Sequence, residues 1–143
     1  MNAEERARLL RLQRLEKIRA IAKQTAARDA AAAESTLGQL RALSERTSRL
    51  ADDYAARSGA QQDGAALRQL SGFVDGLGTL TNKTRADASR AEAIADAKLR
   101  ILGEAERRRA AVEERAKAQA QLIARGRQVP VLGARKVNGT GLE

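Results

Sequence analysis

The strongest constraint on the fold of this chain is a thin apolar stripe that recurs at alternating steps of three and four residues. Such a stripe averages about 3.5 residues per repeat, which keeps one helix face toward a partner helix while the two supercoil. Its members are Leu67, Leu70, Val74, Leu77, Thr81, Thr84, Ala88, Ala91, Ala95, Lys98, Leu102, Ala105, Arg109, Val112, Ala116, Gln119 and Ile123. Most of the other positions are charged, polar or alanine, so this helix requires another helix rather than a globular core.

Residues 3–57 supply a candidate partner helix, because they contain no proline and only one glycine, Gly38. An apolar seam along this segment is predicted through Leu12, Leu15, Ala22, Ala26, Ala33, Leu40, Leu43, Thr47, Leu50 and Tyr54. Between residues 19 and 33 its register is less well defined, because a shifted stripe competes with it. That stripe consists of Ile18, Ile21 and Thr25.

A short polar segment, 58–64, separates the two helices. Gly59 suits the left-handed position that ends a helix, and Asp63 suits the N-cap of the next one. A connection this short favours an antiparallel hairpin, and the alternative is a kinked or continuous rod that pairs only between molecules. We therefore predict an all-α fold, an antiparallel coiled-coil hairpin over residues 1–127 with helices 3–57 and 65–126.

Gly126 and Pro130 are predicted to end the second helix. The remaining residues, 128–143, show no helical period and are interpreted as a flexible basic tail.

The composition argues against catalysis. The chain has one Phe, one Tyr and no Trp, His or Cys, which removes imidazole bases, thiolates and the usual zinc ligands. Its carboxylates alternate with basic neighbours, as in surface ion pairs rather than an acid–base pair. Gly72, Gly76 and Gly78 do not form a phosphate loop, since no strand precedes them and no Gly-Lys-Ser/Thr sequence follows. We expect no enzymatic activity, no metal and no cofactor.

The net charge of +9 indicates an anionic partner, which leaves nucleic acid, a membrane surface or an acidic protein. No apolar run approaches the roughly 20 residues needed to span a bilayer, and Arg11 and Arg14 interrupt the N-terminal leucines. We therefore expect a cytoplasmic protein. Residues 6–23 hold seven basic residues and one acidic residue beside a broad apolar face, which suits an anionic membrane. A basic coiled coil that binds nucleic acid or such a membrane is the alternative function.

An apolar stripe near the start of the second helix favours a protein partner instead. Its members share one helix face at steps of four, three and four residues and are Phe73, Leu77, Leu80 and Thr84. This stripe is either a docking surface or the place where the hairpin packs more deeply.

The segment Leu67-Arg68-Gln69-Leu70-Ser71-Gly72-Phe73-Val74-Asp75-Gly76-Leu77 resembles the FliJ family of flagellar export proteins. Members of that family place a Phe and a following Leu near the start of the second helix. The resemblance implies an antiparallel coiled coil similar to the central stalk of rotary ATP synthases. It also implies a non-enzymatic stalk of the flagellar type III export apparatus, which links the export ATPase hexamer to the membrane export gate and handles export chaperones.

The same resemblance implies a location and binding residues. The protein would act in the cytoplasm, peripheral to the inner membrane at the flagellar basal body. The stripe Phe73, Leu77, Leu80 and Thr84 would touch the export gate. The two helix termini would enter the ATPase through Arg8, Arg11, Leu12, Arg14, Leu15, Arg115, Lys117 and Leu122.

Overall fold

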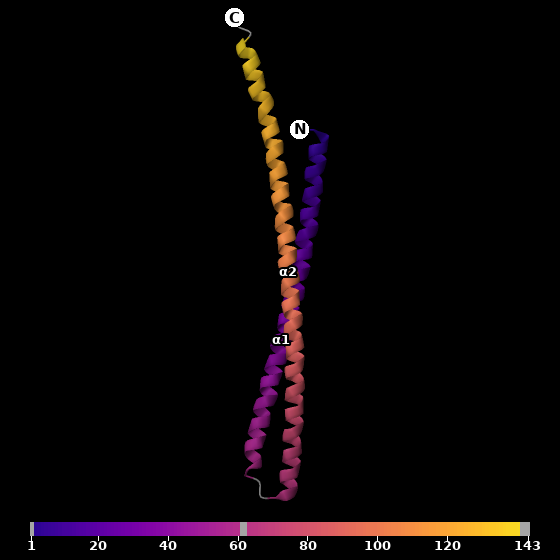
Figure 1. The fold of residues 1–143 in the computed structure, drawn as a ribbon, viewed down its shortest axis with the longest axis vertical. Helices are drawn as coiled ribbons and strands as arrows, with labels where there is room; N and C mark the ends of the chain where they lie inside the picture. Colours follow the sequence, from indigo (N-terminus) through magenta and orange to yellow (C-terminus); the bar gives the residue numbers. More distant parts are fainter. Residues whose placement is uncertain (1, 61–62, 141–143) are drawn as a thin grey trace. The chain divides into compact units, whose positions relative to one another are not determined.

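The computed structural model describes residues 2–60 and 63–140, with side chains up to Arg127. They form two long helices, α1 (Ala3–Ser58) and α2 (Gly64–Thr140) (Figure 1). The contacts divide the chain into two units. Unit 1 comprises Met1–Ala26 and Ile101–Glu143, and unit 2 comprises Ala27–Arg100. Within each unit a segment of α1 packs against a segment of α2, which confirms the predicted helical hairpin.

Local capping explains where α1 begins and ends. The Glu5 backbone N–H donates to Oδ1 of Asn2 over 2.8 Å, which satisfies one of the free donors of the first turn. At the other end, the Ser58 hydroxyl donates to the Ala55 carbonyl over 2.6 Å, and the Ala60 N–H donates to the Arg57 carbonyl over 3.1 Å. The left-handed conformation predicted for Gly59 is wrong, because no glycine in the described ranges has a positive φ. The three-residue turn at Arg57 closes the helix without it.

Asp63 caps α2 as predicted. Its Oδ1 accepts from the Ala65 N–H over 3.1 Å, and its carbonyl accepts the first helical bond from the Leu67 N–H over 2.9 Å. Residues 61 and 62 of the predicted turn lie outside the described residues.

The seam predicted on α2 is confirmed in both units. Every seam position from Leu70 to Ile123 is buried or half-buried, whereas Leu67 at the start of the helix is 40% exposed. In unit 2 the best-buried cluster consists of Leu37, Ala91 and Ala95, with Ala33 and Leu40 packed against it. Small side chains on α2 leave room for one large side chain from α1, so this core is narrow and depends on close approach of the helices.

The seam predicted on α1 is wrong by one residue at several places. Ser44 and Ala51 occupy the seam, whereas Leu43 and Leu50 are each 39% exposed. Further toward the N-terminus, Ala22 is exposed and Lys23 is half-buried. The cause is the phase of the three-four alternation. The step from Leu37 to Leu40 in the core is three residues, so the next step is four and reaches Ser44.

The polar seam of unit 2 satisfies its own hydrogen bonds. The buried Thr81 hydroxyl donates to the buried Thr47 hydroxyl over 3.1 Å, across the two helices. The Thr47 hydroxyl in turn lies 3.1 Å from the Leu43 carbonyl. A polar pair that is satisfied in this way costs little to bury, which is why threonine can replace leucine at these positions.

The helix end predicted at Gly126 is not the end of α2. The helix continues through Gly126 and Pro130 to Thr140, so residues 128–140 of the predicted tail have a helical backbone. Gly and Pro lower helix propensity, and Pro removes one backbone donor, but neither change requires the helix to stop at that residue. Residues 141–143 of the predicted tail lie outside the described residues.

Candidate protein-binding surfaces

The coiled-coil register of unit 2 divides its surface into two unlike sides. We write the heptad as abcdefg, with the seam at a and d; Leu37 and Thr81 are then a residues, and Leu40 and Thr84 are d residues. Positions e and g flank the seam on opposite sides. The Arg41–Glu92 ion pair (3.6 Å) joins the two helices through e positions only. The g positions therefore lie on the other side of the seam.

The e side of unit 2 is polar and cross-linked. Besides the Arg41–Glu92 pair, the Arg85 guanidinium donates to the Ser48 hydroxyl over 3.4 Å, again between two e positions. A shallow groove on this side is lined largely by the same charged and small polar residues. Exposed pairs of this kind add little stability, but they hold the register. Among the e positions of unit 2, Leu99 is the one with a large exposed apolar side chain.

The g side of unit 2 carries several large apolar side chains among polar ones. We call four of them the apolar shoulder, Leu43 and Leu50 from α1 with Phe73 and Leu80 from α2; other g positions hold Ile94, Asp29, Thr36, Arg57 and Asp87. The four shoulder residues remain 39, 39, 49 and 42% exposed. These four side chains lie at g positions, on the same flank of the α1–α2 seam. Sequence reasoning missed Leu43 and Leu50 as surface residues, because a one-residue shift of the α1 seam had placed them in the interface.

Phe73 is held in place by an aromatic contact. Its ring lies edge-on to the ring of Tyr54 on α1, with centroids 4.9 Å apart and planes at 78°. The Arg57 guanidinium carbon lies 4.9 Å from the centroid of the same Tyr54 ring. Edge-to-face and cation–π contacts each add about 0.5–1 kcal/mol beyond area burial. Phe73 is thus an exposed aromatic side chain that is already partly immobilised.

The predicted gate-binding stripe is not a single exposed face. Leu77 is half-buried and Thr84 is only 4% exposed, since both are d residues of the seam. Phe73 and Leu80 are g residues and reach the surface. The seam periodicity in the sequence already distinguishes these two pairs. Leu77 and Thr84 belong to the repeat that faces α1, whereas Phe73 and Leu80 do not.

The residues predicted to enter the ATPase all belong to unit 1. Leu12 and Leu15 are half-buried against the seam, so only part of each is available. The exposed members are Arg8, Arg11, Arg14, Arg115, Lys117 and Leu122. Leu122 is 59% exposed and is the only large apolar side chain among them. At the predicted positions, unit 1 therefore exposes mainly guanidinium and ammonium groups.

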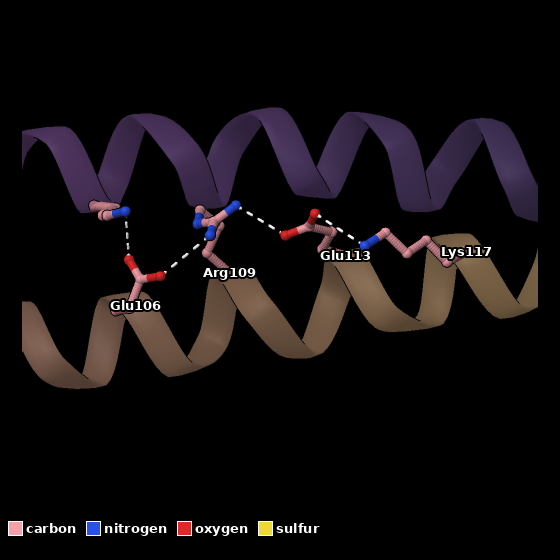
Figure 2. Close-up of polar contacts among 5 residues, drawn as sticks. Glu106, Arg109, Glu113 and Lys117 are labelled. Atoms are coloured by element: carbon pink, nitrogen blue, oxygen red, sulfur yellow. Dashed lines mark hydrogen bonds and ion pairs between the residues drawn. The ribbon is translucent and has the colours of Figure 1, made fainter.

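A chain of ion pairs crosses unit 1 (Figure 2). Lys23 Nζ on α1 lies 2.5 Å from Glu106 on α2, and Glu106 also accepts from Arg109 over 3.1 Å. Arg109 then reaches Glu113 over 3.0 Å, and Glu113 pairs with Lys117 over 3.4 Å. Arg109 occupies an a position of the seam, and its two carboxylate partners allow that charge to lie between the helices.

Electrostatics keeps this network charged. The hydrogen bond from Lys23 lowers the pKa of Glu106 below its ordinary value, with a further contribution from Arg109. The hydrogen bond to Glu106 raises the pKa of the Arg109 guanidinium. Both groups are therefore ionised at neutral pH, and the attraction between α1 and α2 at Lys23–Glu106 persists until the solution becomes acidic.

Replacing Glu106 by Gln tests this network. Because the pKa of Glu106 is lowered in the folded state, its stabilising contribution is present above the ordinary glutamate range and is lost as the pH falls through the folded pKa. We expect E106Q to lower Tm slightly at pH 7, with a difference from wild type that shrinks in acid and in 1 M salt.

Thermal unfolding followed by circular dichroism at pH 7 and pH 3 checks this expectation. Glu104→Gln is the matched control, since the described residues show no ion pair at Glu104. An E106Q deficit that persists unchanged at pH 3 would show that the carboxylate charge is not its cause.

The outer face of α1 in unit 1 also carries exposed apolar residues. Leu10, Ile18 and Ile21 are 54, 62 and 63% exposed, and exposed Arg11 and Arg14 lie among them. Ile18 and Ile21 belong to the shifted stripe noted in the sequence, and it is not the stripe that faces α2. This cationic-apolar face is separate from the apolar shoulder of unit 2.

Within residues 2–60 and 63–127, no cluster of three or more acidic, His or Cys side chains is placed to hold a metal ion. In the part of the chain that the structure describes, neither helix has a stretch sufficiently long and apolar to cross a bilayer. Comparison with known proteins found no matching family, no matching curated protein and no matching solved structure.

Proposed function

We propose that this chain is a non-enzymatic adaptor that binds other proteins through the outer faces of its helical hairpin. More specifically, we propose that it acts as the stalk of a flagellar type III export apparatus, between the export ATPase hexamer and the membrane export gate, with export chaperones as further partners. The observation that carries this proposal is Phe73, an aromatic residue that is 49% exposed within the segment that resembles the FliJ family.

The proposed gate contact uses Phe73 and Leu80. Fully burying such a side chain stabilises a complex by about 1.5–3 kcal/mol, and the exposed half of each is available for that purpose. The Tyr54 contact reduces the conformational entropy that Phe73 loses on binding. Leu77 and Thr84 contribute indirectly, because they anchor this stretch of α2 to α1.

The proposed ATPase contact uses the exposed basic residues of unit 1, among them Arg8, Arg11 and Arg115. Surface charges of this kind steer association and are weakened by salt, so they suit a contact that must form and break repeatedly. In this proposal the protein lies in the cytoplasm and reaches the inner membrane through its partners.

Binding of the purified chain to the cytoplasmic domain of the export gate tests the proposal. We expect Phe73→Ala to weaken this binding by about tenfold or more, as for an aromatic hot spot, and to leave binding to the ATPase hexamer unchanged. Leu99→Ala is the matched control, because Leu99 is 45% exposed but occupies an e position. Isothermal titration calorimetry with each partner separately provides the measurement.

Two results would contradict the proposal. One is the absence of binding to either partner at about physiological salt. The other is gate binding that Leu99→Ala weakens as much as Phe73→Ala does.

The cationic-apolar face of α1 favours a second candidate, binding to an anionic membrane surface. Leu10, Ile18 and Ile21 are all more than half exposed, with arginines beside them, and such faces lie in the headgroup region of anionic bilayers. Flotation with phosphatidylserine vesicles distinguishes the two candidates. Retention on vesicles that Ile18→Gln and Ile21→Gln abolish, without capture by the export ATPase, would favour the membrane.

A further inference from the structure

We infer that a second copy of this chain packs on the apolar shoulder of unit 2, so that two hairpins form a four-helix contact through Leu43, Leu50, Phe73 and Leu80. This inference does not rest on the export proposal, since two of the four residues lie on α1 and have no part in the proposed gate contact. It commits to one occupant, another molecule of the same sequence.

The first argument is continuity with the interface inside the hairpin. A two-stranded coiled coil needs apolar residues only at a and d, whereas helices of a larger bundle carry an additional apolar position at e or g. In unit 2 both helices place large apolar residues at g positions, Leu43 and Leu50 on α1 and Phe73 and Leu80 on α2, although other g positions are polar. The shoulder therefore widens the apolar α1–α2 seam on one side only. This is expected for helices that pack against additional helices on that side.

The second argument is the contrast between the two flanks. The e side is bridged by Arg41–Glu92 and Arg85–Ser48, so its polar groups already have partners within the chain. The apolar shoulder leaves four large apolar side chains 39–49% exposed. Water contact with such area is unfavourable by about 25 cal/mol per Å², and covering it is the main gain available to this surface.

The third argument is charge, which selects the occupant. The chain as a whole carries +9, yet residues 39–57 and 72–87, which hold the shoulder, contain six basic and five acidic side chains. An anionic partner would gain more from the basic surfaces of unit 1. A nearly neutral surface with both signs does not repel a copy of itself, so the high net charge of the whole chain does not oppose self-association here.

Gly76 leaves room beside the shoulder. It occupies the c position between Phe73 and Leu80, and a Cβ built there would meet no atom within 4 Å. A helix of the second copy can therefore approach the α2 backbone closely at this point. Self-association and the proposed gate contact share Phe73 and Leu80, so the two would exclude each other.

Sedimentation equilibrium of the full chain tests the inference. We expect wild type to reach twice the 15.4 kDa mass of one chain in the micromolar range, at about physiological salt. Leu43→Gln combined with Leu80→Gln should raise the dimer dissociation constant by about tenfold or more, because a buried polar group replaces apolar contact. Leu99→Gln on the e side, with similar exposure, should leave it unchanged, and circular dichroism verifies that each variant stays helical.

Cysteine cross-linking adds a measurement that leaves the shoulder intact. The chain has no cysteine, so Gly76→Cys introduces a single thiol beside the shoulder, and Gly38→Cys introduces one at a b position of α1 with equally open surroundings. We expect a short bis-maleimide to link two Gly76→Cys chains efficiently and Gly38→Cys chains poorly.

A monomeric mass throughout the concentration range, or equal cross-linking of the two cysteine variants, would overturn the inference. The inference would also be overturned if Leu99→Gln disrupted the dimer and the double variant Leu43→Gln, Leu80→Gln did not. A strictly monomeric chain whose shoulder binds the export gate would assign this surface to a different protein instead.

Discussion

Replacing Leu37 by Ala is expected to lower the free energy of unfolding by about 2–4 kcal/mol, the largest stability effect of the substitutions considered for this chain. Leu37 is only 4% exposed and is the one large side chain in the buried cluster of unit 2, where it meets Ala91 and Ala95. The side chains of those alanines are too short to fill the space that Leu37 leaves, so the cavity persists. A loss of this size is a large part of the total stability of most domains.

Urea unfolding followed by circular dichroism at 222 nm measures this effect, and Leu99→Ala provides the comparison. Leu99 is 45% exposed, so its truncation removes little buried area and should cost less than about 1 kcal/mol. Both variants keep the same chemistry, Leu to Ala, in the same unit. Equal losses for the two variants would contradict the register of α1 and α2 described above.

Replacing Ala95 by Leu is expected to destabilise the chain by about 1–3 kcal/mol, although it adds apolar surface to a helix. Ala95 is completely buried, and its small side chain sets how closely α1 approaches α2 in unit 2. A leucine at position 95 would overlap with the side chain of Leu37 and force the two helices apart locally. Leucine has almost the same helix propensity as alanine, so the helix itself does not explain the loss.

Ala93→Leu is the matched control for this overpacking effect. Ala93 lies on α2 only two residues earlier, but it occupies the outward f position and is exposed. Its substitution should change the free energy of unfolding by about 0.5 kcal/mol or less. Stabilisation of the chain by Ala95→Leu would show that Ala95 does not limit how closely α1 and α2 approach in unit 2.

Much of the fold followed from periodicity alone. The α2 seam from Leu70 to Ile123 needed no tertiary information, because a repeat of about 3.5 residues identifies the face that meets a partner helix. The capping role of Asp63 was also local, since its side chain bonds to a backbone group only two residues away. Long helices, their antiparallel pairing and a short connection were predictable for the same reason.

The α1 register was not predictable in this way. Leu40, Thr47 and Tyr54 fit two seams that differ by one residue, and hydrophobicity favoured the one through Leu43 and Leu50. The seam through Ser44 and Ala51 is the one in the structure. That choice depends on α2, where Thr81 hydrogen-bonds to Thr47 and where Ala91 and Ala95 accept Leu37.

The amino-acid sequence by itself determined that this chain forms helices, that α1 and α2 are separated near Asp63, and which face of α2 is covered, because these properties depend on residues within a few turns of one another. It did not determine where α2 ends. Only the tertiary structure decided which leucines remain at the surface. The two candidate seams of α1 differ by about 100° in direction, a one-residue rotation of the helix, and the selection between them comes from the side chains of the opposite helix. The apolar shoulder of unit 2 exists as a surface because of that selection.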